Sequence, residues 1–537
     1  MSDQVSNSPG NSDATSKKQH GANDVKQNDK NMDSKCNTDG SDSVDNSTSN
    51  NIKKQIIKGA APVDEYCLKQ NVEVYYDKYE IYSAKLNQAN VAKNNNKFYV
   101  IQILKTIGKQ EFYLFSRWGR VGFQGQSSFK GPYPLSQAIQ EYQQKLSEKT
   151  RSKDYRILKM DYGEDAASQN LEEKIKRDSE KCQLPKPVIN LMNLIFDINI
   201  INDQMKEIGY DAKKMPLGKL SKDNINKAYG ILKDLYDEVE KQNQNKVKIT
   251  MLCNDFYSFI PHDFGFKKMQ DQILDNSQKV KEKLEMIDSI QNMQISTKII
   301  EDQSQDQNGI MSNFIQHNYE KLNCTISPLK DEKIYQTIKT YLENTHSHIH
   351  DRYTLEIEDI FEVERKGEKE QYMKQINNKR LLWHGSRLTN YVGILSQGLR
   401  IAPPEAPVNG YMFGKGVYFA DMCSKSANYC QANKTNNTGL VFLCEVALGD
   451  MNNKISSDFN ASNLPQGKQS VRALGQICPP KDSLVNIYDD VRISLGKCDY
   501  RNSNSSKFQL LHNEYIVYNI NQIMLKYLLR LKFHFKR

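Results

Sequence analysis

Long apolar runs are missing from this sequence. A helix that crosses a bilayer needs about 20 predominantly apolar residues, and a secretory signal needs a shorter apolar core near the N-terminus. Neither occurs in the 537 residues. We therefore expect neither a membrane span nor secretion.

Paired cysteines are missing as well. The ten cysteines are scattered and never form a C-x-x-C pair, whereas zinc sites are built from closely spaced ligand pairs. We expect reduced thiols, as in the cytosol or nucleus, and no metal site. Cys423 and Cys430 are interpreted as small buried apolar residues rather than ligands.

The N-terminal stretch has almost nothing from which to build a core. Residues 1–50 contain no aromatic residue, no leucine and no isoleucine. Five lysines stand against eight aspartates there, a net charge of −3, which leaves +12 for the remainder of a chain whose total is +9. Such a composition cannot bury enough apolar surface to fold. We predict a disordered tail over residues 1–62 and a basic folded part.

A dinucleotide-binding fingerprint is also absent. Gly414-Lys415-Gly416 lacks the third glycine of G-x-G-x-x-G and does not follow the start of a βαβ unit. A bound dinucleotide would therefore be held in another way than in a Rossmann fold.

Strand-forming residues come first after the tail. The β-branched and aromatic runs at 97–105 and 111–122, joined by residues 106–110, predict a hairpin. A helix rich in Gln and Glu is expected from Leu135 to about Thr150. These elements indicate a small sheet with a helix beside it.

Basic residues are concentrated on this small unit. Between residues 85 and 130 a single acid, Glu111, accompanies eight basic residues: Lys85, Lys93, Lys97, Lys105, Lys109, Arg117, Arg120 and Lys130. Interleaved with Tyr99, Phe115 and Trp118, they predict contact with a nucleic-acid backbone. A solvated basic face with Trp118 in the core is the alternative.

Helical periodicity follows. A helix over 188–208, apolar nearly all round, is expected at the centre of a bundle. Ser221 is expected to cap the next helix, and a further helix is expected from about Lys267 to Ile299. Residues 301–311 are typical of a linker.

The segment from Arg380 to Cys430 is the densest in chemistry. A short strand ends at His384-Gly385-Ser386, and a second is expected over 416–420. Asp421 is expected to cap a helix over 422–430, on which Ser426 and Tyr429 share one face. A flat ligand carrying an amide would suit such a face, with its ring stacked and its amide hydrogen-bonded.

These residues also match a family. HGSR at 384–387, APPEAPVNGYMFGKGVYFAD at 402–421, SKSANYC at 424–430 and LLHNEYIVY at 510–518 together resemble the catalytic domain of the DNA-dependent poly(ADP-ribose) polymerases. Trp118-Gly119-Arg120, after its lysine-rich hairpin, resembles the WGR domain of that family, and NDFYSFIPHDFG at 254–265 is similar to its helical regulatory domain.

The resemblance implies a multidomain α+β chain. It would comprise the disordered tail (1–62), a small β-sheet WGR domain (63–165), an all-α regulatory bundle (181–305) and a mixed antiparallel-sheet ADP-ribosyltransferase domain (312–537). Zinc fingers and a BRCT domain are not expected. DNA sensing would then rest mainly with the WGR domain, through Trp118, Arg120 and Lys97. The regulatory bundle would form an autoinhibitory cover over the nucleotide site.

The resemblance also implies NAD⁺ as an ADP-ribose donor. The nicotinamide would stack between Tyr429 and Tyr418, and its amide would bond Ser426 and the Gly385 backbone. The other implied NAD⁺ contacts are His384, Ser386, Gly393 and Arg400.

The implied catalytic residues are His384, Tyr418, Glu514 and Lys425, the last near the acceptor. A carboxylate at Glu514 could stabilise the oxocarbenium-like charge on the ribose and activate an acceptor hydroxyl. Polymerising members have this His, Tyr, Glu triad, whereas relatives without the acid transfer single units. His512 stands where close relatives commonly have tyrosine, and the C-terminus lacks their Leu-Trp, so branching and acceptor type stay open.

The function implied is a nuclear enzyme that responds to DNA ends or nicks. It would build poly(ADP-ribose) on itself and on other proteins, chromatin proteins among them, in DNA repair signalling. A mono-ADP-ribosyltransferase, a catalytically silent DNA-end scaffold and a DNA-independent enzyme are the alternatives.

Overall fold

The computed structural model describes residues 61–151, 154–160, 182–207, 220–265, 267–302, 313–406, 411–501 and 507–536. The chain divides into two units, Met1–Gln55 and Ile56–Arg537, and all described residues belong to the second. The predicted disordered tail lies outside the described residues except for its last two, and the predicted linker lies outside them except for its first two. In the described part of the chain, no helix is long and apolar enough to span a membrane.

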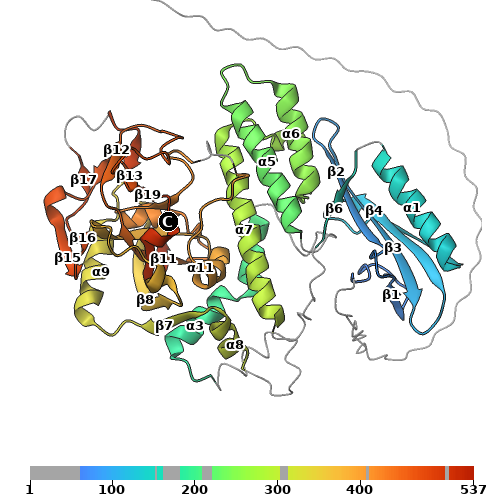
Figure 1. Ribbon diagram of the computed structural model, residues 1–537, viewed down its shortest axis with the longest axis horizontal. Coiled ribbons are helices and arrows are strands. Elements are labelled where there is room, and N and C mark those ends of the chain that lie inside the picture. Colours follow the sequence, from blue (N-terminus) through green and yellow to red (C-terminus); the bar gives the residue numbers. More distant parts are fainter. Residues whose placement is uncertain are drawn as a thin grey trace, which may run out of the picture. The chain divides into compact units, whose positions relative to one another are not determined.

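The first structured part is a sheet with one long helix on it (Figure 1). Its elements are β1 (Val72–Val74), β2 (Ser83–Asn90), β3 (Asn95–Thr106), β4 (Phe112–Arg120), β5 (Gln126–Tyr133), α1 (Leu135–Arg151) and β6 (Arg156–Leu158). The order in the sheet is β5-β4-β3-β2-β6, with β1 paired to β3. The predicted hairpin and helix are confirmed, because β3 and β4 pair antiparallel and Ala138 and Tyr142 of α1 pack on the sheet.

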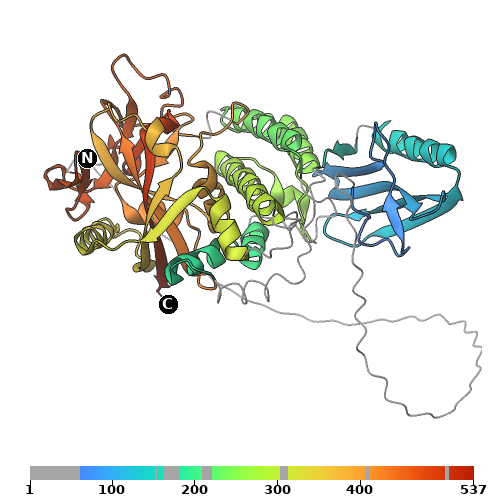
Figure 2. The ribbon, with the colours of Figure 1, turned by 60° about the horizontal axis from the view of Figure 1, so that its bottom comes forward.

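The second part is helical, and α5, α6 and α7 run side by side in both views (Figures 1 and 2). Its elements are α3 (Lys186–Ile195), α4 (Ile198–Glu207), α5 (Lys222–Val239), α6 (Lys246–Phe259), the 3₁₀ turn η2 (Met269–Gln272), α7 (Ser277–Asp302) and α8 (Phe314–Lys321). Ser221 caps α5 as predicted, because its side chain accepts from the Asn224 N–H.

Two helix predictions were wrong in extent. The single helix over 188–208 is broken at Asp197, whose Oδ1 accepts from the backbone N–H groups of Asn199 and Ile200 and so favours a new helix start. The apolar face of α3 packs in a cluster with Phe361 and Leu382 of the third part rather than at the centre of the bundle. The helix expected from Lys267 is η2 followed by an interruption, and α7 begins only at Ser277.

The third part is built on a seven-stranded sheet of order β15-β16-β9-β11-β20-β8-β7. Its strands are β7 (Cys324–Pro328), β8 (Tyr353–Arg365), β9 (Lys379–Gly385), β11 (Thr438–Ala447), β15 (Leu484–Tyr488), β16 (Val491–Ser494) and β20 (Ile523–Phe535). Leu440, Phe442 and Cys444 of β11 are fully buried on one face, and Val441 and Leu443 on the other. This central strand therefore reads as a continuous apolar run.

Two smaller sheets adjoin the large one. A four-stranded sheet has the order β10-β19-β13-β12, and a three-stranded sheet has the order β17-β14-β18. Their strands are β10 (Val417–Phe419), β12 (Met451–Lys454), β13 (Ser470–Ala473), β14 (Gly475–Cys478), β17 (Asp499–Tyr500), β18 (Leu510–His512) and β19 (Glu514–Val517). The helices and 3₁₀ turns are α9 (Glu332–Asn344), α10 (Glu368–Gln371), η4 (Leu388–Asn390), α11 (Tyr391–Gln397), α12 (Cys423–Asn428), η5 (Lys481–Ser483) and η7 (Ile520–Gln522). The architecture is the multidomain α+β class that the sequence predicted.

Apolar cores join the three parts. Ala89, Val91 and Leu158 of the first part share one buried cluster with α5, α6 and α7, and that cluster also includes Ala406 of the third part. Hydrogen bonds accompany it: the Asn87 side chain donates to the Tyr257 and Ser258 carbonyls, at 2.9 and 3.1 Å. The sheet and the helices thus pack as neighbours within one core.

Candidate active site

His384 lies near the end of β9, where the backbone meets a second strand. Trp383 and Ala420 exchange both backbone hydrogen bonds, at 2.8 and 3.0 Å, so β9 is fixed beside β10. The Nδ1 atom of His384 lies 2.9 Å from the Tyr418 carbonyl oxygen. Because a carbonyl only accepts, Nδ1 carries the proton and Nε2 is left as an acceptor. Burial lowers the pKa of His384, which keeps the ring neutral.

Gly385 is required by close backbone packing. A Cβ atom at this position would lie 1.9 Å from the Ser426 carbonyl oxygen, so no larger residue fits. The contact presses the end of β9 against α12. Ser426 is buried there, and Tyr429, which follows the helix as its C-cap, is 50% exposed. An amide bound at Gly385 would therefore lie beside both residues.

Tyr418 is held firmly within β10. Its hydroxyl donates to the Gly414 carbonyl at 2.7 Å and accepts from the Phe413 N–H at 3.1 Å. Burial is the largest cause that raises the pKa of Tyr418. The hydrogen bond from Phe413 lowers this pKa and the charge of Glu514 raises it, so the net direction is upward. The phenol therefore stays neutral and serves as a fixed ring.

Glu514 comes from the far end of the chain and reaches the same place. It begins β19, which pairs with β10 so that Tyr418 lies opposite Ile516. Its Oε1 accepts from Lys425 Nζ at 2.7 Å, and both side chains are largely buried, with 13% and 15% of their surfaces exposed. After burial, the charge of Glu514 is the next largest cause that raises the pKa of Tyr429. The structure thus brings Glu514, Lys425, Tyr418 and Tyr429 together.

The other predicted nucleotide contacts lie beneath α7. Asn390 donates to Ser386 Oγ at 2.8 Å and accepts from Asn292 of α7 at 3.1 Å. Asn292 also accepts from Arg400, and a Cβ on Gly393 would lie 2.3 Å from Asn292 Oδ1. Ser386, Gly393 and Arg400 are therefore close to one another, but α7 occupies their surroundings.

Asn292 and Asn390 were missed by the sequence reasoning. An asparagine on a long helix is unremarkable by itself, and Asn292 stands about one hundred positions before the residues it contacts. No local pattern could have identified it.

The cap predicted for α12 was wrong. The Asp421 side chain makes no cap hydrogen bond, and Met422 is the N-cap residue. Asp421 is buried and instead accepts from Asn513 and Tyr515. The helix is also shorter than expected, ending at Asn428.

His512, which departs from the expected tyrosine, is buried two positions before Glu514. Its Nε2 lies 2.9 Å from Ser347 Oγ, and its ring centroid is 4.9 Å from that of His350. Burial, with the charges of His350 and Lys425, lowers the pKa of His512 to about 3. Its backbone carbonyl accepts from Lys425. A neutral imidazole therefore lines this side of the site.

The predicted DNA contacts lie on neighbouring strands. Tyr99 of β3 stacks on Trp118 of β4 at 5.6 Å, and Lys97 pairs with Arg120 two positions along the same strands. Lys97 is exposed, whereas Arg120 donates to the Gly265 carbonyl at 3.0 Å. Arg120 therefore contacts the helical part of the chain.

Two residues do not belong to the basic face. Arg117 is 1% exposed and forms an ion pair with buried Asp64, with Nε to Oδ1 at 2.8 Å, and Lys85 is 8% exposed. The prediction that all eight basic residues face a partner was therefore wrong for these two. The alternation of side chains along a strand turned them inward.

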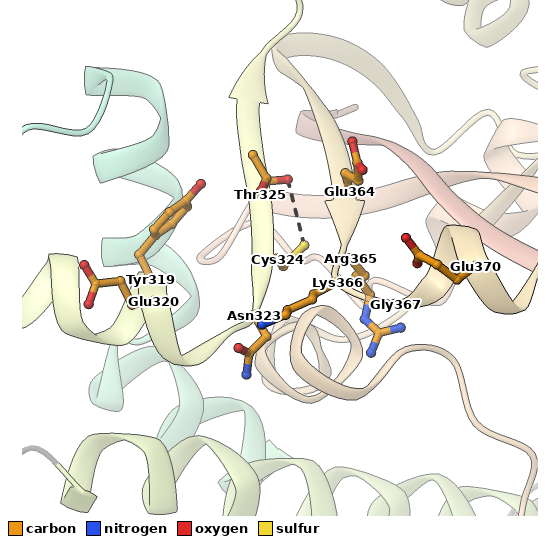
Figure 3. Close-up of a pocket in the computed structure, with 10 residues that line it drawn as sticks. All are labelled: Tyr319, Glu320, Asn323, Cys324, Thr325, Glu364, Arg365, Lys366, Gly367 and Glu370. Atoms are coloured by element: carbon orange, nitrogen blue, oxygen red, sulfur yellow. Dashed lines mark hydrogen bonds between the residues drawn. The ribbon is translucent and has the colours of Figure 1, made fainter.

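A hollow of about 420 Å³ lies elsewhere, at the turn between β8 and α10 and beside β7 (Figure 3). Its lining includes Glu320, Glu364, Glu370 and Arg365, and the guanidinium of Arg365 is already bonded to Leu395, Ser396 and Glu368. None of the predicted site residues lines it.

Three family models match consecutive parts of the chain. The WGR domain matches residues 82–160, the poly(ADP-ribose) polymerase regulatory domain matches 182–319, and the poly(ADP-ribose) polymerase catalytic domain matches 332–533. Poly(ADP-ribose) polymerase 2 of Zea mays is 45% identical over 504 residues, covering 89% of this chain and 75% of that protein. Poly(ADP-ribose) polymerase 2 of Homo sapiens is 38% identical over 510 residues, covering 91% and 86%. The chain belongs to the poly(ADP-ribose) polymerase family.

This poly(ADP-ribose) polymerase is an ADP-ribosyltransferase, and NAD⁺ is its substrate. The predicted recognition and enzyme class are thereby confirmed. The boundaries 63–165, 181–305 and 312–537 stay predictions, as do the roles of the individual site residues.

Proposed function

We propose that this polymerase responds to DNA breaks and builds chains of ADP-ribose on itself and on other proteins, chromatin proteins among them. Its place is the nucleus, and its role is in DNA repair signalling. The observation that carries the proposal is the meeting of Glu514 and Lys425 with the Tyr418 and Tyr429 rings beside His384.

The chemistry follows from this arrangement. Loss of nicotinamide leaves an oxocarbenium-like charge on the ribose. The Glu514 carboxylate holds the 2′-hydroxyl and stabilises that charge, then accepts the proton of an incoming hydroxyl. The Lys425 ammonium, 2.7 Å from Glu514 Oε1, orients the carboxylate.

Binding of the dinucleotide uses the residues around the acid. The pyridinium stacks on Tyr429 and Tyr418, a cation–π contact of about 1 to 2 kcal/mol when desolvated. Ser426 and the Gly385 backbone take the amide. His384 offers its Nε2 atom to a ribose hydroxyl, because Nδ1–H is engaged by the Tyr418 carbonyl.

Control by DNA passes through α7. Asn292 bonds Arg400 and Asn390, so a nucleotide that used Ser386, Gly393 and Arg400 would meet this helix. The sheet that carries Trp118 and Lys97 shares its core with α7. A DNA end bound on that sheet would favour a displaced α7 and so admit NAD⁺. The similarity to the WGR domain supports this route.

The test is a product ladder. The full chain is incubated with labelled NAD⁺, with and without nicked duplex bearing 5′-phosphates. We expect long chains only with the nick, and Glu514→Gln is expected to lower the rate about 100-fold or more, since it removes a preorganised group that stabilises charge. Glu362→Gln, an exposed carboxylate on β8, is the control and should keep the ladder.

Each departure from that result has a definite meaning. A full ladder from Glu514→Gln removes Glu514 from its role. Single units in the unsubstituted protein identify a mono-ADP-ribosyltransferase. Equal activity with and without the nick identifies an enzyme independent of DNA.

A further inference from the structure

We infer that Asp421 is a positioning residue for the transfer reaction, because its single carboxylate holds the strand that carries Glu514 to the segment that carries Tyr418, Lys425 and Ser426. The inference rests on the proposed role of Glu514. It assigns to Asp421 no contact with NAD⁺.

One carboxylate oxygen binds both neighbours of Glu514. Asp421 Oδ2 accepts from Asn513 Nδ2 at 2.7 Å and from the Tyr515 hydroxyl at 2.9 Å. Side chains at alternate positions of an extended segment point to opposite faces. Asn513 and Tyr515 therefore bind Asp421 on one face of the strand, while Glu514 between them contacts Lys425 on the other.

The position of Asp421 in the chain gives this contact its effect. The residue before Asp421, Ala420, is hydrogen-bonded to Trp383 of β9, and Ala420 itself follows β10, which contains Tyr418. The helix α12, with Lys425 and Ser426, comes directly after Asp421. A shift of Asp421 relative to Asn513 would thus move Glu514 against every group proposed to hold the dinucleotide.

The partners of Asp421 are themselves fixed. Asn513 Oδ1 accepts from the Gly475 N–H at 2.9 Å and from Arg501 Nη2 at 2.8 Å. Arg380 of β9 donates to the Tyr515 hydroxyl at 3.2 Å. Because Asn513 Oδ1 and the Tyr515 hydroxyl already have these partners, the bonds of Asn513 and Tyr515 to Asp421 form only in this register of the strand.

A structural role alone would not require a charge here. Asp421 is 4% exposed, and burying a carboxylate costs several kcal/mol unless hydrogen bonds offset it. Its Oδ1 has no hydrogen-bond partner among the described residues, so the group is not fully compensated. A buried carboxylate that bonds both neighbours of Glu514 through one oxygen suits a residue that orients Glu514.

The experiment separates turnover from binding and from stability. Asp421→Asn is expected to lower kcat for nicotinamide release about 10- to 100-fold, as losses of such supporting contacts do. The KM for NAD⁺ should change less than about threefold, because the groups proposed to hold the nicotinamide stay in place. Glu445→Gln is the matched control, since Glu445 is a buried carboxylate that accepts from Tyr488 away from the site.

A reciprocal pair provides the decisive rescue. In Asp421→Asn with Asn513→Asp, the amide at 421 donates to the carboxylate at 513, whose other oxygen still accepts from Gly475 and Arg501. We expect kcat within about threefold of the unsubstituted enzyme. Tyr515→Phe removes a single hydroxyl with little change in packing, and we expect it to lower kcat about threefold to tenfold.

The inference is overturned if Asp421→Asn keeps kcat within about twofold of the unsubstituted enzyme, or if Glu445→Gln loses as much. It is also overturned if the double variant melts normally yet stays as slow as Asp421→Asn. Glu514→Gln is measured in the same assay. If Glu514→Gln is active, the proposed function fails. If Glu514→Gln is inactive and Asp421→Asn keeps its activity, only the positioning role of Asp421 fails.

Discussion

Individual residues of the site owe their chemistry to neighbours that are distant in sequence. Partial burial lowers the pKa of His384, and its proton is on Nδ1 because the Tyr418 carbonyl accepts there. Glu514 and Lys425 stand 89 positions apart yet meet at 2.7 Å. The residue types were recognisable from the motifs, whereas their protonation and partners depended on the folded chain.

His512 provides a test of burial at this scale. Its pKa of about 3 in the folded chain lies below the ordinary value of 6.5. Between these two values the unfolded chain binds a proton that the folded chain excludes, so stability falls as the pH falls below about 6.5.

We therefore predict that His512→Gln loses less stability on acidification than the unsubstituted chain. At pH 5 the difference should approach about 2 kcal/mol, which corresponds to a few degrees in Tm. Thermal unfolding at pH 7.5 and pH 5.0 measures it. His534→Gln, on an exposed histidine of β20, serves as control. An identical acid shift in His512→Gln and the unsubstituted chain would contradict the prediction.

Among the helices and strands, some were predicted correctly from local sequence patterns and others were not. The hairpin of β3 and β4 followed from its strand-forming residues, and the start of α5 followed from its Ser221 cap. The break before α4 and the late start of α7 did not, because apolar periodicity continues across both. Asp421 failed as a cap since its carboxylate is engaged by Asn513 and Tyr515. A local cap at Asp197 decided the break before α4, whereas tertiary partners decided the role of Asp421.

The helix α7 provides the prediction for this scale. Asn292→Ala removes its hydrogen bonds to Arg400 and Asn390 and frees the space beside Gly393. Hydrogen bonds to a charged group contribute about 1.5 to 3 kcal/mol, and about 1.4 kcal/mol corresponds to a tenfold change in population. We expect nicotinamide release without DNA to rise about tenfold.

Gln278 is on the exposed side of the same helix, and Gln278→Ala is the control. It should leave the DNA-free rate unchanged. A DNA-free rate in Asn292→Ala equal to that of the unsubstituted enzyme would show that α7 does not restrain the site through this residue.

At the scale of the whole molecule, the first sheet and the third part meet through the helices. The Asn96 side chain donates to the His262 carbonyl at 2.7 Å, and His262 Nε2 lies 3.0 Å from Lys283 Nζ on α7. The same helix contains Asn292, which accepts a hydrogen bond from Arg400, a residue predicted to contact NAD⁺. A continuous set of packed groups therefore connects the predicted DNA face with the predicted NAD⁺ site.

Asn96→Ala tests this connection. Asn96 is 1% exposed, so it cannot touch DNA directly. Allosteric coupling between sites is typically about 1 to 3 kcal/mol, and we expect stimulation by nicked DNA to fall about fivefold or more with DNA affinity retained. Fluorescence anisotropy measures the DNA affinity, and nicotinamide release measures the stimulation. Gln143→Ala, on the exposed side of α1, is the control. Undiminished stimulation would exclude the contact as a route.

The sequence by itself determined the class of chain, the order of its parts and the family, and it supplied the residue types of the predicted catalytic site. These properties depend on local composition and on short motifs such as HGSR and LLHNEYIVY, which are legible along a linear chain. Only the tertiary structure decided that Asn292 lies at Gly393, that Arg117 turns inward to Asp64 and that Asp421 binds both neighbours of Glu514. Such contacts join residues far apart in sequence, and their energy depends on burial and on partner geometry, which no local pattern encodes.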